Sequence, residues 1–290
     1  MKKLIALLLS IALLSVCAVS LADGITIAVP NDNTNEGRAL LLLQSYGIIT
    51  LREDAGIAAT PADIVDNPYN ISFAEVEAAA VPNYLEDAQV DYAIINNNYA
   101  LDYYKTFLPD RSLVDDALLM ESADSPYVNV VCVNEGNENT PEAKALAAAV
   151  LSQQVYDFIN ENYGGAAVAV AENPTDGYDP DVDYEALAGT TITIICSPTP
   201  HAQILALAKD ILAAKGITLE ITEVVDYVTP NLLVDAGDAF ANYFAHVPYQ
   251  DDFNQENGTH LVSIAGVHVE PMTMLGASQK DLSALGIEAK

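Results

Sequence analysis

Strand-like and helix-like runs alternate along almost the whole chain. The strand-like runs, which are short and apolar, cover residues 25–29, 71–78, 92–95, 127–133, 191–196 and 217–224. The helix-like runs cover residues 35–46, 84–88, 140–163 and 201–215, and one more begins after residue 99. Such alternation is typical of α/β folds, in which helices cover mainly parallel sheets. We therefore expect an α/β protein with mainly parallel sheets.

One break interrupts this alternation. Residues 164–189 contain two adjacent glycines, two prolines and an acidic run from residue 176 to residue 185, a composition typical of a linker. A chain of 290 residues has room for about two domains. We therefore predict two lobes, with a fresh α/β unit starting after the linker.

The charge balance excludes several classes of partner. The chain has 41 acidic and 11 basic residues, which gives a formal net charge of −30. Nucleic acids and anionic membrane surfaces bind basic surfaces, so neither is expected as a partner. The apolar content of 51% is high enough for packed cores, which excludes a disordered acidic chain.

The first residues are typical of an export signal. Residues 1–22 begin with Lys2 and Lys3, continue with an apolar run, and end on small residues at Ala22, the pattern of a cleaved signal peptide. Cys17 is an alternative processing site, because the three residues before it loosely match a bacterial lipobox. We expect an exported chain, either lipid-anchored through Cys17 or released by cleavage after Ala22.

The sequence contains none of the common catalytic motifs. It has no GxSxG, HExxH, P-loop or GxGxxG sequence, and its four histidines show no metal-ligand spacing. Cys132 and Cys196 lie inside apolar runs and are predicted to be buried free thiols, with a disulfide or a metal site as the alternative. We expect a protein that is not an enzyme and that has no cofactor and no metal.

Arg38 is one of three arginines in this acidic chain, and it lies near the start of the first predicted helix. An asparagine-rich turn joins that helix to the strand-like run 25–29. A guanidinium near a helix N-terminus opposes the helix dipole, so a negative group is expected beside it. A bound carboxylate would suit this place, because the guanidinium fork can donate two parallel hydrogen bonds to it.

Two further clusters carry side chains suited to a small ligand. Asn96 directly follows a strand-like run, so its amide either caps the next helix or points into the crevice at the carboxyl end of the strand. Tyr227, Phe244, His246 and Tyr249 form either an ordinary aromatic core patch or the apolar slot of a small-molecule pocket. With the arginine, these clusters suggest a pocket for a zwitterion that has an apolar side chain.

Six segments are similar to one known family, the NlpA/MetQ-type methionine-binding proteins of ABC importers. The segments that resemble the second half of these proteins are residues 28–44, 91–100 and 121–129. The segments that resemble their first half are residues 197–205, 226–231 and 237–249. The halves thus stand in reversed order, and the chain resembles a circular permutant whose linker at 164–189 bridges the usual termini.

The resemblance implies a fold and a function. The fold is a two-lobed periplasmic-binding-protein fold of type II-like architecture. The function is capture of methionine, in its L or D form, for uptake by a membrane-bound ABC permease and ATPase complex. The protein is expected to be a monomer. It is expected on the outer face of the cytoplasmic membrane, at the cell surface or in the periplasm. The alternatives are binding of another apolar amino acid or a methionyl dipeptide, and a surface protein that has lost its ligand.

The resemblance also implies roles for individual residues. Arg38 pairs with the ligand carboxylate, and Asn35 and Asn96 lie near the amino-acid head. The ring cage around the thioether, where sulfur–aromatic contacts are favourable, consists of Tyr227, Phe244, His246 and Tyr249.

The resemblance finally divides the chain into four parts. Residues 1–22 are the signal peptide, and residues 23–124 form the lobe that carries the asparagine-rich turn and Arg38. Residues 125–276 form the lobe with the aromatic slot, and residues 277–290 form a tail that crosses back toward the first lobe.

Overall fold

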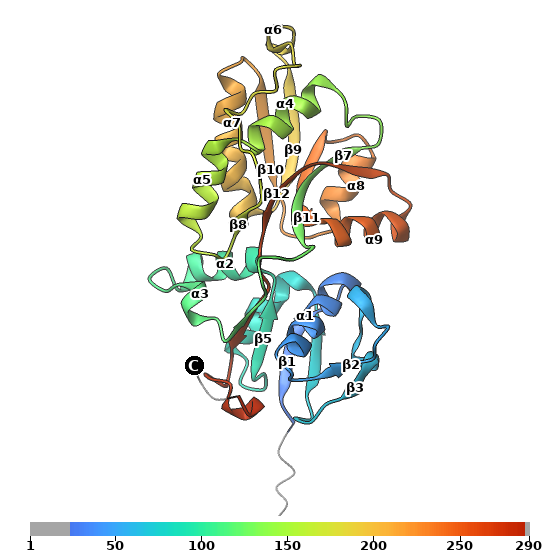
Figure 1. Cartoon of the computed structure of the whole chain (residues 1–290), viewed down its shortest axis with the longest axis vertical. Coiled ribbons are helices and arrows are strands. Elements are labelled where there is room, and N and C mark those ends of the chain that lie inside the picture. The colour runs from blue at the N-terminus through green and yellow to red at the C-terminus, as the bar shows by residue number, and fades with distance from the viewer. Residues whose placement is uncertain (1–23, 288–290) are drawn as a thin grey trace, which may run out of the picture.

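The chain folds into two lobes, each built around its own β-sheet (Figure 1). The structure is a computed structural model, and it describes residues 24–287. The first sheet has the strand order β4-β1-β5-β13-β6, and the second has the order β10-β9-β11-β7-β12-β8. The prediction of a two-lobed α/β protein is therefore confirmed.

The strands of the first lobe are β1 (Thr26–Pro30), β4 (Ser72–Val76), β5 (Tyr92–Ile95), β6 (Leu119–Met120) and β13 (Thr273–Gly276), with a separate small pair formed by β2 (Thr50–Leu51) and β3 (Ile64–Asp66). The strands of the second lobe are β7 (Val128–Asn134), β8 (Val168–Ala169), β9 (Thr191–Cys196), β10 (Thr218–Glu223), β11 (Ala241–His246) and β12 (Leu261–Val269).

The α-helices of the first lobe are α1 (Asn33–Ser45), α2 (Asn97–Phe107) and α3 (Leu113–Asp116). Short 3₁₀ segments accompany them, namely η1 (Gly56–Ala58), η2 (Pro61–Asp63), η3 (Ala78–Glu86) and η5 (Ser283–Leu285). The helices of the second lobe are α4 (Pro141–Val150), α5 (Gln153–Asn162), α6 (Tyr184–Leu187), the π turn η4 (Pro198–Ala202), α7 (Gln203–Ala213), α8 (Thr229–Asp235) and α9 (Val247–Asn257).

Both sheets are mixed, so the prediction of mainly parallel sheets was wrong in this detail. The parallel part is β4-β1-β5 in the first sheet and β10-β9-β11 in the second. The remaining strands β13, β6, β7, β12 and β8 pair antiparallel. The cause is the connection between the lobes, because a strand that enters a sheet from the facing lobe runs opposite to strands that end at that edge.

The chain crosses between the lobes twice, at residues 121–127 and at residues 270–272. Strand β13, dark red in Figure 1, belongs to the first sheet, where Met274 pairs with Ile94. The predicted boundary at residue 276 therefore falls too late, and the return to the first lobe precedes residue 277. Sequence pattern could not show this, because β12 and β13 form one nearly continuous apolar stretch.

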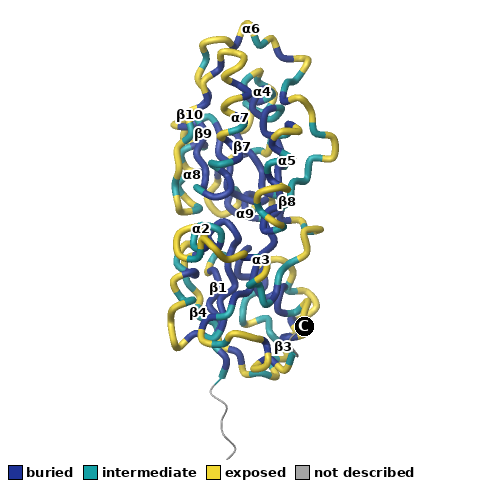
Figure 2. Tube along the Cα trace, turned by 90° about the vertical axis from the view of Figure 1, so that its left-hand side faces the viewer, coloured by how far each residue is buried: buried dark blue, intermediate teal, exposed yellow. Residues whose placement is uncertain are grey.

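Each lobe has its own hydrophobic core. Figure 2 shows buried chain in the middle of both lobes. The second lobe packs residues such as Val131, Ile194 and Leu205 between its sheet and helices. The first lobe has Ile27 of β1 and Leu43 of α1 in one core cluster. Full burial of such a side chain stabilises the fold by about 1.5–3 kcal/mol. Each lobe is therefore stabilised by its own core.

The helix predicted over residues 140–163 is two helices, α4 and α5. Ser152 caps the second, because its Oγ accepts a hydrogen bond from Val155 N at 3.2 Å. At the break, Gln153 N donates to Thr175 O, and Thr175 N donates to Leu151 O. Thr175, a residue of the predicted linker, thus forms hydrogen bonds with backbone groups that would have bonded within a continuous helix.

The predicted signal peptide, including Cys17, lies outside the described residues. Within residues 24–287 no helix has both the length and the apolar character that a membrane crossing requires. Cys132 and Cys196 are buried free thiols, as predicted, and neither bonds to another described residue. Burial raises the pKa of each thiol to about 12, so both stay protonated and unreactive at neutral pH.

Candidate functional site

A cavity lies between the two lobes, and the atom-free space in it is about 320 Å³ when the part open to solvent is included. All seven residues predicted to bind a ligand line it, and five more side chains join them. The lining consists of Asn35, Arg38, Asn96, Asn97, Asn98, Asn129, Tyr227, Phe244, Ala245, His246, Tyr249 and Glu270.

The start of α1 forms part of the first-lobe wall of the cavity. Asp32 caps the helix, and its Oδ1 accepts a hydrogen bond from Asn35 N at 3.0 Å. Asn35 Nδ2 also donates to both carboxylate oxygens of Asp32, at 2.9 and 3.1 Å. Burial raises the pKa of Asp32 despite these bonds. The cap therefore fixes the Asn35 side chain as well as the helix.

Arg38 is buried, with 3% of its surface exposed, and already has a carboxylate partner. Its Nε and Nη2 donate to Glu121, with a shortest distance of 2.5 Å, and Nη2 also donates to Glu270 O at 2.7 Å. The Tyr127 ring lies 4.2 Å from the guanidinium carbon. The expected negative group is thus Glu121, and within residues 24–287 Nη1 makes no hydrogen bond.

Asn96 occupies the N-cap position of α2, but its side chain does not cap the helix. Its Nδ2 donates to Asn35 Oδ1 at 2.8 Å, and its Oδ1 is buried with no partner among residues 24–287. Of the two interpretations offered by the sequence, the amide that points into the crevice is the one observed. Asn97 Oδ1 and Asn98 Nδ2 also lack partners in the described part of the chain.

Asn35 and His246 connect the two lobes across the cavity. His246 Nε2 lies 3.1 Å from Asn35 Oδ1, and His246 Nδ1 accepts a hydrogen bond from Tyr249 N as the cap of α9. Because Nδ1 accepts, the proton of the neutral ring lies on Nε2 and is donated to Asn35. Burial and the nearby Arg38 hold the pKa of His246 well below its usual range. The contact is therefore a neutral hydrogen bond.

The second-lobe wall is an aromatic cage. Phe244 lies 5.7 Å from Tyr227 and 6.0 Å from Tyr249, and the two tyrosines are 5.8 Å apart, measured between ring centres. The polar tips of the rings are occupied, since Tyr249 Oη donates to Tyr227 O and Tyr227 Oη donates to Asn98 Oδ1. Phe244, Tyr249 and Phe253 belong to one hydrophobic cluster, and Tyr227 packs against both it and a core cluster of the first lobe. The cage thus presents ring faces, with satisfied hydroxyls at its edge.

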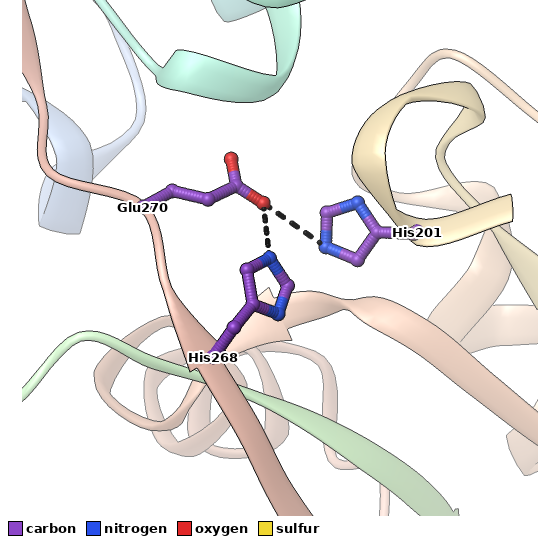
Figure 3. A group of neighbouring side chains, drawn as sticks. All are labelled: His201, His268 and Glu270. Carbon is purple, nitrogen blue, oxygen red and sulfur yellow. Dashed lines mark hydrogen bonds and ion pairs between the residues drawn. The ribbon is translucent and has the colours of Figure 1, made fainter. Parts of the chain in front are cut away.

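Glu270 lies at the crossover between the lobes, next to two buried histidines (Figure 3). His268 Nε2 is 2.7 Å from Glu270 Oε1, and His201 Nε2 is 3.4 Å from the same oxygen. Burial raises the pKa of Glu270, while His201, Arg38 and the Asn98 backbone N–H oppose that rise. Burial lowers the pKa of both histidines to about 3, so they are neutral near pH 7.

The sequence did not identify Glu121, Glu270 or the histidines that contact Glu270. Most of their partners are far along the chain: 83 residues separate Glu121 from Arg38, and only His268 and Glu270 are close in sequence. Asn97 and Asn98 had a visible signal, because they continue the asparagine run that starts at residue 96. The histidines lacked ligand spacing in sequence, and only the fold brings His201 and His268 together.

Comparison with known proteins decides the family. A sequence model of the NlpA lipoprotein family matches residues 16–171 and 192–290. The chain belongs to the NlpA lipoprotein family. Among its relatives are the D-methionine-binding lipoprotein MetQ of Salmonella typhimurium and outer membrane lipoprotein 3 of Mannheimia haemolytica, each 42% identical over 148 residues.

These alignments are partial. They cover 51% of this chain and 52–53% of the relatives, so the chain spans about half the length of the curated relatives it matches. A crystal structure of the methionine-binding protein MetQ aligns with 39% identity, a TM-score of 0.46, and 51% and 58% coverage of the two chains. A nutrient-binding protein from Burkholderia cenocepacia bound to methionine aligns with 41% identity, a TM-score of 0.43, and 49% and 57% coverage.

Proposed function

We propose that this protein is an extracytoplasmic solute-binding protein that captures methionine, in its L or D form, for uptake by an ABC transporter. The observation that carries the proposal is the cavity whose walls come from both lobes. Its first-lobe wall has a guanidinium and unpartnered amides, and its second-lobe wall has three facing aromatic rings. A ligand with a charged head and an apolar tail fits such a division.

Each half of methionine has a partner in this proposal. The carboxylate accepts hydrogen bonds from Arg38 Nη1 and Asn98 Nδ2. Among residues 24–287, Arg38 uses Nε and Nη2 for its own hydrogen bonds, and Asn98 Nδ2 has no partner. The thioether lies among Tyr227, Phe244 and Tyr249, where sulfur–aromatic contact contributes about 0.3–1.5 kcal/mol per contact. Asn35 mainly holds other residues of the cavity wall in place, because its Oδ1 already accepts hydrogen bonds from Asn96 and His246.

The mechanism proposed is capture by lobe closure, without a chemical step. The lobes are in contact here through several hydrogen bonds, including His246 to Asn35 and Tyr227 to Asn98. Both bonds join residues of the cavity wall, so an occupant that contacts both walls at once stabilises the closed arrangement. Small-angle scattering should show a smaller radius of gyration with methionine than without it.

Calorimetry on ligand-free protein tests the proposal. The protein is unfolded in denaturant, dialysed to remove any co-purified ligand, refolded, and titrated with L-methionine, D-methionine, L-norleucine, L-leucine and a methionyl dipeptide. We expect one methionine per chain and weaker binding of norleucine, which has a methylene in place of sulfur. If another amino acid or the dipeptide binds more tightly than methionine, that compound is the ligand and the methionine assignment is wrong. If none of the compounds binds, the result supports a surface protein that has lost its ligand.

We further propose that the two halves of the chain stand in the reverse of the family order. Two observations support this: single relatives align over only about half of each chain, and the family match is interrupted at residues 172–191, which largely fall in the predicted linker. A chain rebuilt with residues 190–290 before residues 24–189, which keeps β8, α6 and Thr175, should fold and bind methionine within a few-fold of the original. Failure to fold would contradict the permuted order.

The membrane partner and the location belong to the same proposal. The family name and the relatives' names describe lipoproteins, which supports an exported protein that delivers its ligand to a permease and ATPase complex as a monomer. Mass spectrometry of the protein isolated from membranes tests the anchor, since a lipid on Cys17 and a free N-terminus at Asp23 differ in mass. Size-exclusion chromatography with light scattering tests the monomer.

A further inference from the structure

Oxygen atoms without partners gather around the cavity. Asn96 Oδ1 and Asn97 Oδ1 are buried and accept no hydrogen bond from any of residues 24–287. Glu270 lines the same cavity, and over the same range its Oε2 has no side-chain partner, although the backbone N–H of Asn98 interacts with this carboxylate. Buried acceptors without donors cost free energy. The cavity therefore calls for a ligand group that brings several donors.

One oxygen of Glu270 accepts a hydrogen bond from His268 and lies close to His201 (Figure 3). His201 Nε2 contacts Asn129 Oδ1 at 3.0 Å, and because an amide oxygen only accepts, the proton lies on Nε2. The Tyr243 hydroxyl, 2.5 Å from His268 Nδ1, leaves the proton of that ring on Nε2 as well. His268 thus donates to Glu270 Oε1, whereas His201 donates its N–H to Asn129 and places Nε2 3.4 Å from the same Glu270 oxygen. Figure 3 shows the other oxygen of Glu270 pointing away from both rings.

The same side chains have the composition of a metal site, since their ligand atoms lie within 4.8 Å of one another. Two observations favour hydrogen bonding instead. The distance of 2.7 Å from His268 Nε2 to Glu270 Oε1 is that of a hydrogen bond, whereas ligands of a tetrahedral zinc lie roughly 3.3 Å apart. His201 Nδ1 is buried with no acceptor within residues 24–287, whereas a metal-bound histidine donates that N–H to an outer partner.

We propose that Glu270 is the residue that binds the ammonium group of the ligand, and that His201 and His268 are positioning residues that fix its carboxylate. The inference rests on the proposed function, because it requires an amino acid in this cavity. An ammonium group has three N–H donors, and its acceptors are Glu270 Oε2, Asn96 Oδ1 and Asn97 Oδ1.

This assignment defines the class of ligand. A compound with a free α-ammonium next to an apolar tail satisfies Glu270, whether it is an L- or a D-amino acid. An N-acylated amino acid cannot satisfy Glu270, because its nitrogen has one N–H and no positive charge. The buried carboxylate of Glu270 then stays unpaired. Sites built to hydrogen-bond an N–H group reject analogues that lack it strongly, so we expect free amino acids to be favoured at least about 100-fold.

The first experiment changes the ligand and leaves the protein intact. Calorimetry on the ligand-free wild type compares L-methionine with 4-(methylthio)butanoate, which lacks only the amino group, and with N-acetyl-L-methionine. We expect both analogues to bind at least about 100-fold more weakly than methionine. If methionine binds and either analogue binds within threefold of it, the ammonium assignment is overturned and the proposed function stands. If no methionine binds, the proposed function fails and the inference fails with it.

The second experiment changes the protein. In Glu270→Gln, which keeps the shape of the side chain, we expect the affinity ratio of methionine to 4-(methylthio)butanoate to fall roughly 10- to 100-fold. Glu121→Gln is the matched control, because Glu121 contacts Arg38 but does not line the cavity; its affinities change, but its ratio should not. An unchanged ratio in Glu270→Gln contradicts the assignment.

The positioning role of the histidines has its own readout. His268→Phe keeps a ring and removes the donor to Glu270, so the methionine ratio should fall several-fold while circular dichroism stays that of the wild type. A variant that is merely less stable would lower both affinities equally. Titration with zinc chloride in the absence of amino acid should show no binding at this cluster; stoichiometric binding that His201→Asn abolishes would overturn the assignment in favour of a metal site.

Discussion

The two walls of the cavity are built in different ways. The aromatic wall comes mostly from residues close in sequence, since Phe244, His246 and Tyr249 lie at the junction of β11 and α9. The polar wall is assembled from distant segments, because Arg38 depends on Glu121 and on the backbone of Glu270. The aromatic wall has its hydroxyls satisfied by the protein, whereas the polar wall keeps open donors and acceptors.

This difference suggests that the two walls contribute differently to ligand binding. Groups that remain unpaired in a buried wall gain most from a ligand, because they have already paid the desolvation cost. Ring faces gain less per contact and tolerate changes of shape. The polar wall should therefore determine whether an amino acid binds, and the aromatic wall which one.

The largest expected effect follows from removing the guanidinium. Arg38→Ala should weaken methionine binding by at least about 100-fold, because truncating one partner of a buried, hydrogen-bonded charge pair costs about 2–5 kcal/mol. Calorimetry measures the affinity. Thermal unfolding should also show a lower midpoint, since Glu121 loses its partner.

Arg38→Lys is the matched control for this variant. It keeps the positive charge and removes the fork that contacts Glu121 through two nitrogens. We expect intermediate affinity and a smaller loss of stability. Wild-type affinity in both variants would show that the polar wall does not hold the head of the ligand.

The next effect is a dependence of affinity on pH. Glu270 has a raised pKa, and its protonation removes the charge that pairs with an ammonium group, so methionine affinity should fall as the pH drops toward that pKa. His201 and His268, with a pKa of about 3, stay neutral over this range. The charged and titratable groups around Glu270 are Arg38, Asp102, Tyr163, His201, Tyr227, Tyr243 and His268.

Two controls isolate Glu270 in the pH series. In Glu270→Gln the fall in affinity should disappear, although Asp102, whose pKa is also raised, is still present. The affinity for 4-(methylthio)butanoate should rise at low pH in the wild type, because protonation of Glu270 removes its repulsion of an anion. Parallel pH curves for the two ligands would contradict the account.

A smaller effect is expected at the aromatic wall. Phe244→Leu keeps an apolar side chain and removes a ring next to Tyr227 and Tyr249, so methionine affinity should fall about 2- to 10-fold. Norleucine, which has no sulfur, should lose less, so the preference for methionine over norleucine shrinks. Equal losses for both ligands would mean that the wall contributes only apolar area.

The smallest effect is expected outside the cavity. Asn33 Nδ2 donates to Glu256 Oε1 at 2.8 Å, and this contact joins the lobes at an exposed position. Glu256→Ala should change methionine affinity by less than about threefold, as surface substitutions usually stay within about 0.5 kcal/mol. A loss as large as that of Arg38→Ala would show that the rim, and not the walls, controls closure.

The sequence predicted the parts of this molecule that depend on local pattern. The run from Tyr92 to Ile95 is apolar throughout and forms a buried strand, and Asn96 follows it at the cavity as expected. The rings of residues 244–249 lie together because they share one strand end and one helix start. In such places the period of the chain and its turn residues fix the side-chain positions.

The parts that the sequence did not reveal depend on contacts between distant segments. Nothing near Arg38 in sequence indicates that Glu121 would neutralise it, because 83 residues lie between them. His201 looks like an isolated histidine until the fold places it beside His268 and Glu270, whereas His268 lies only two residues from Glu270 in sequence. The mixed sheets and the early return of the chain at β13 likewise depend on how the lobes are connected, which a local pattern does not encode.

The most direct test of the two-walled cavity is a crystal structure of the ligand-free protein soaked with L-selenomethionine. The anomalous signal of selenium locates the tail of the ligand independently of its head. The account predicts a selenium peak among Tyr227, Phe244 and Tyr249, the carboxylate at Arg38 and the ammonium group at Glu270. A selenium peak beside Arg38 would contradict the account. So would a fully occupied selenomethionine site outside the cavity with no selenium peak inside it.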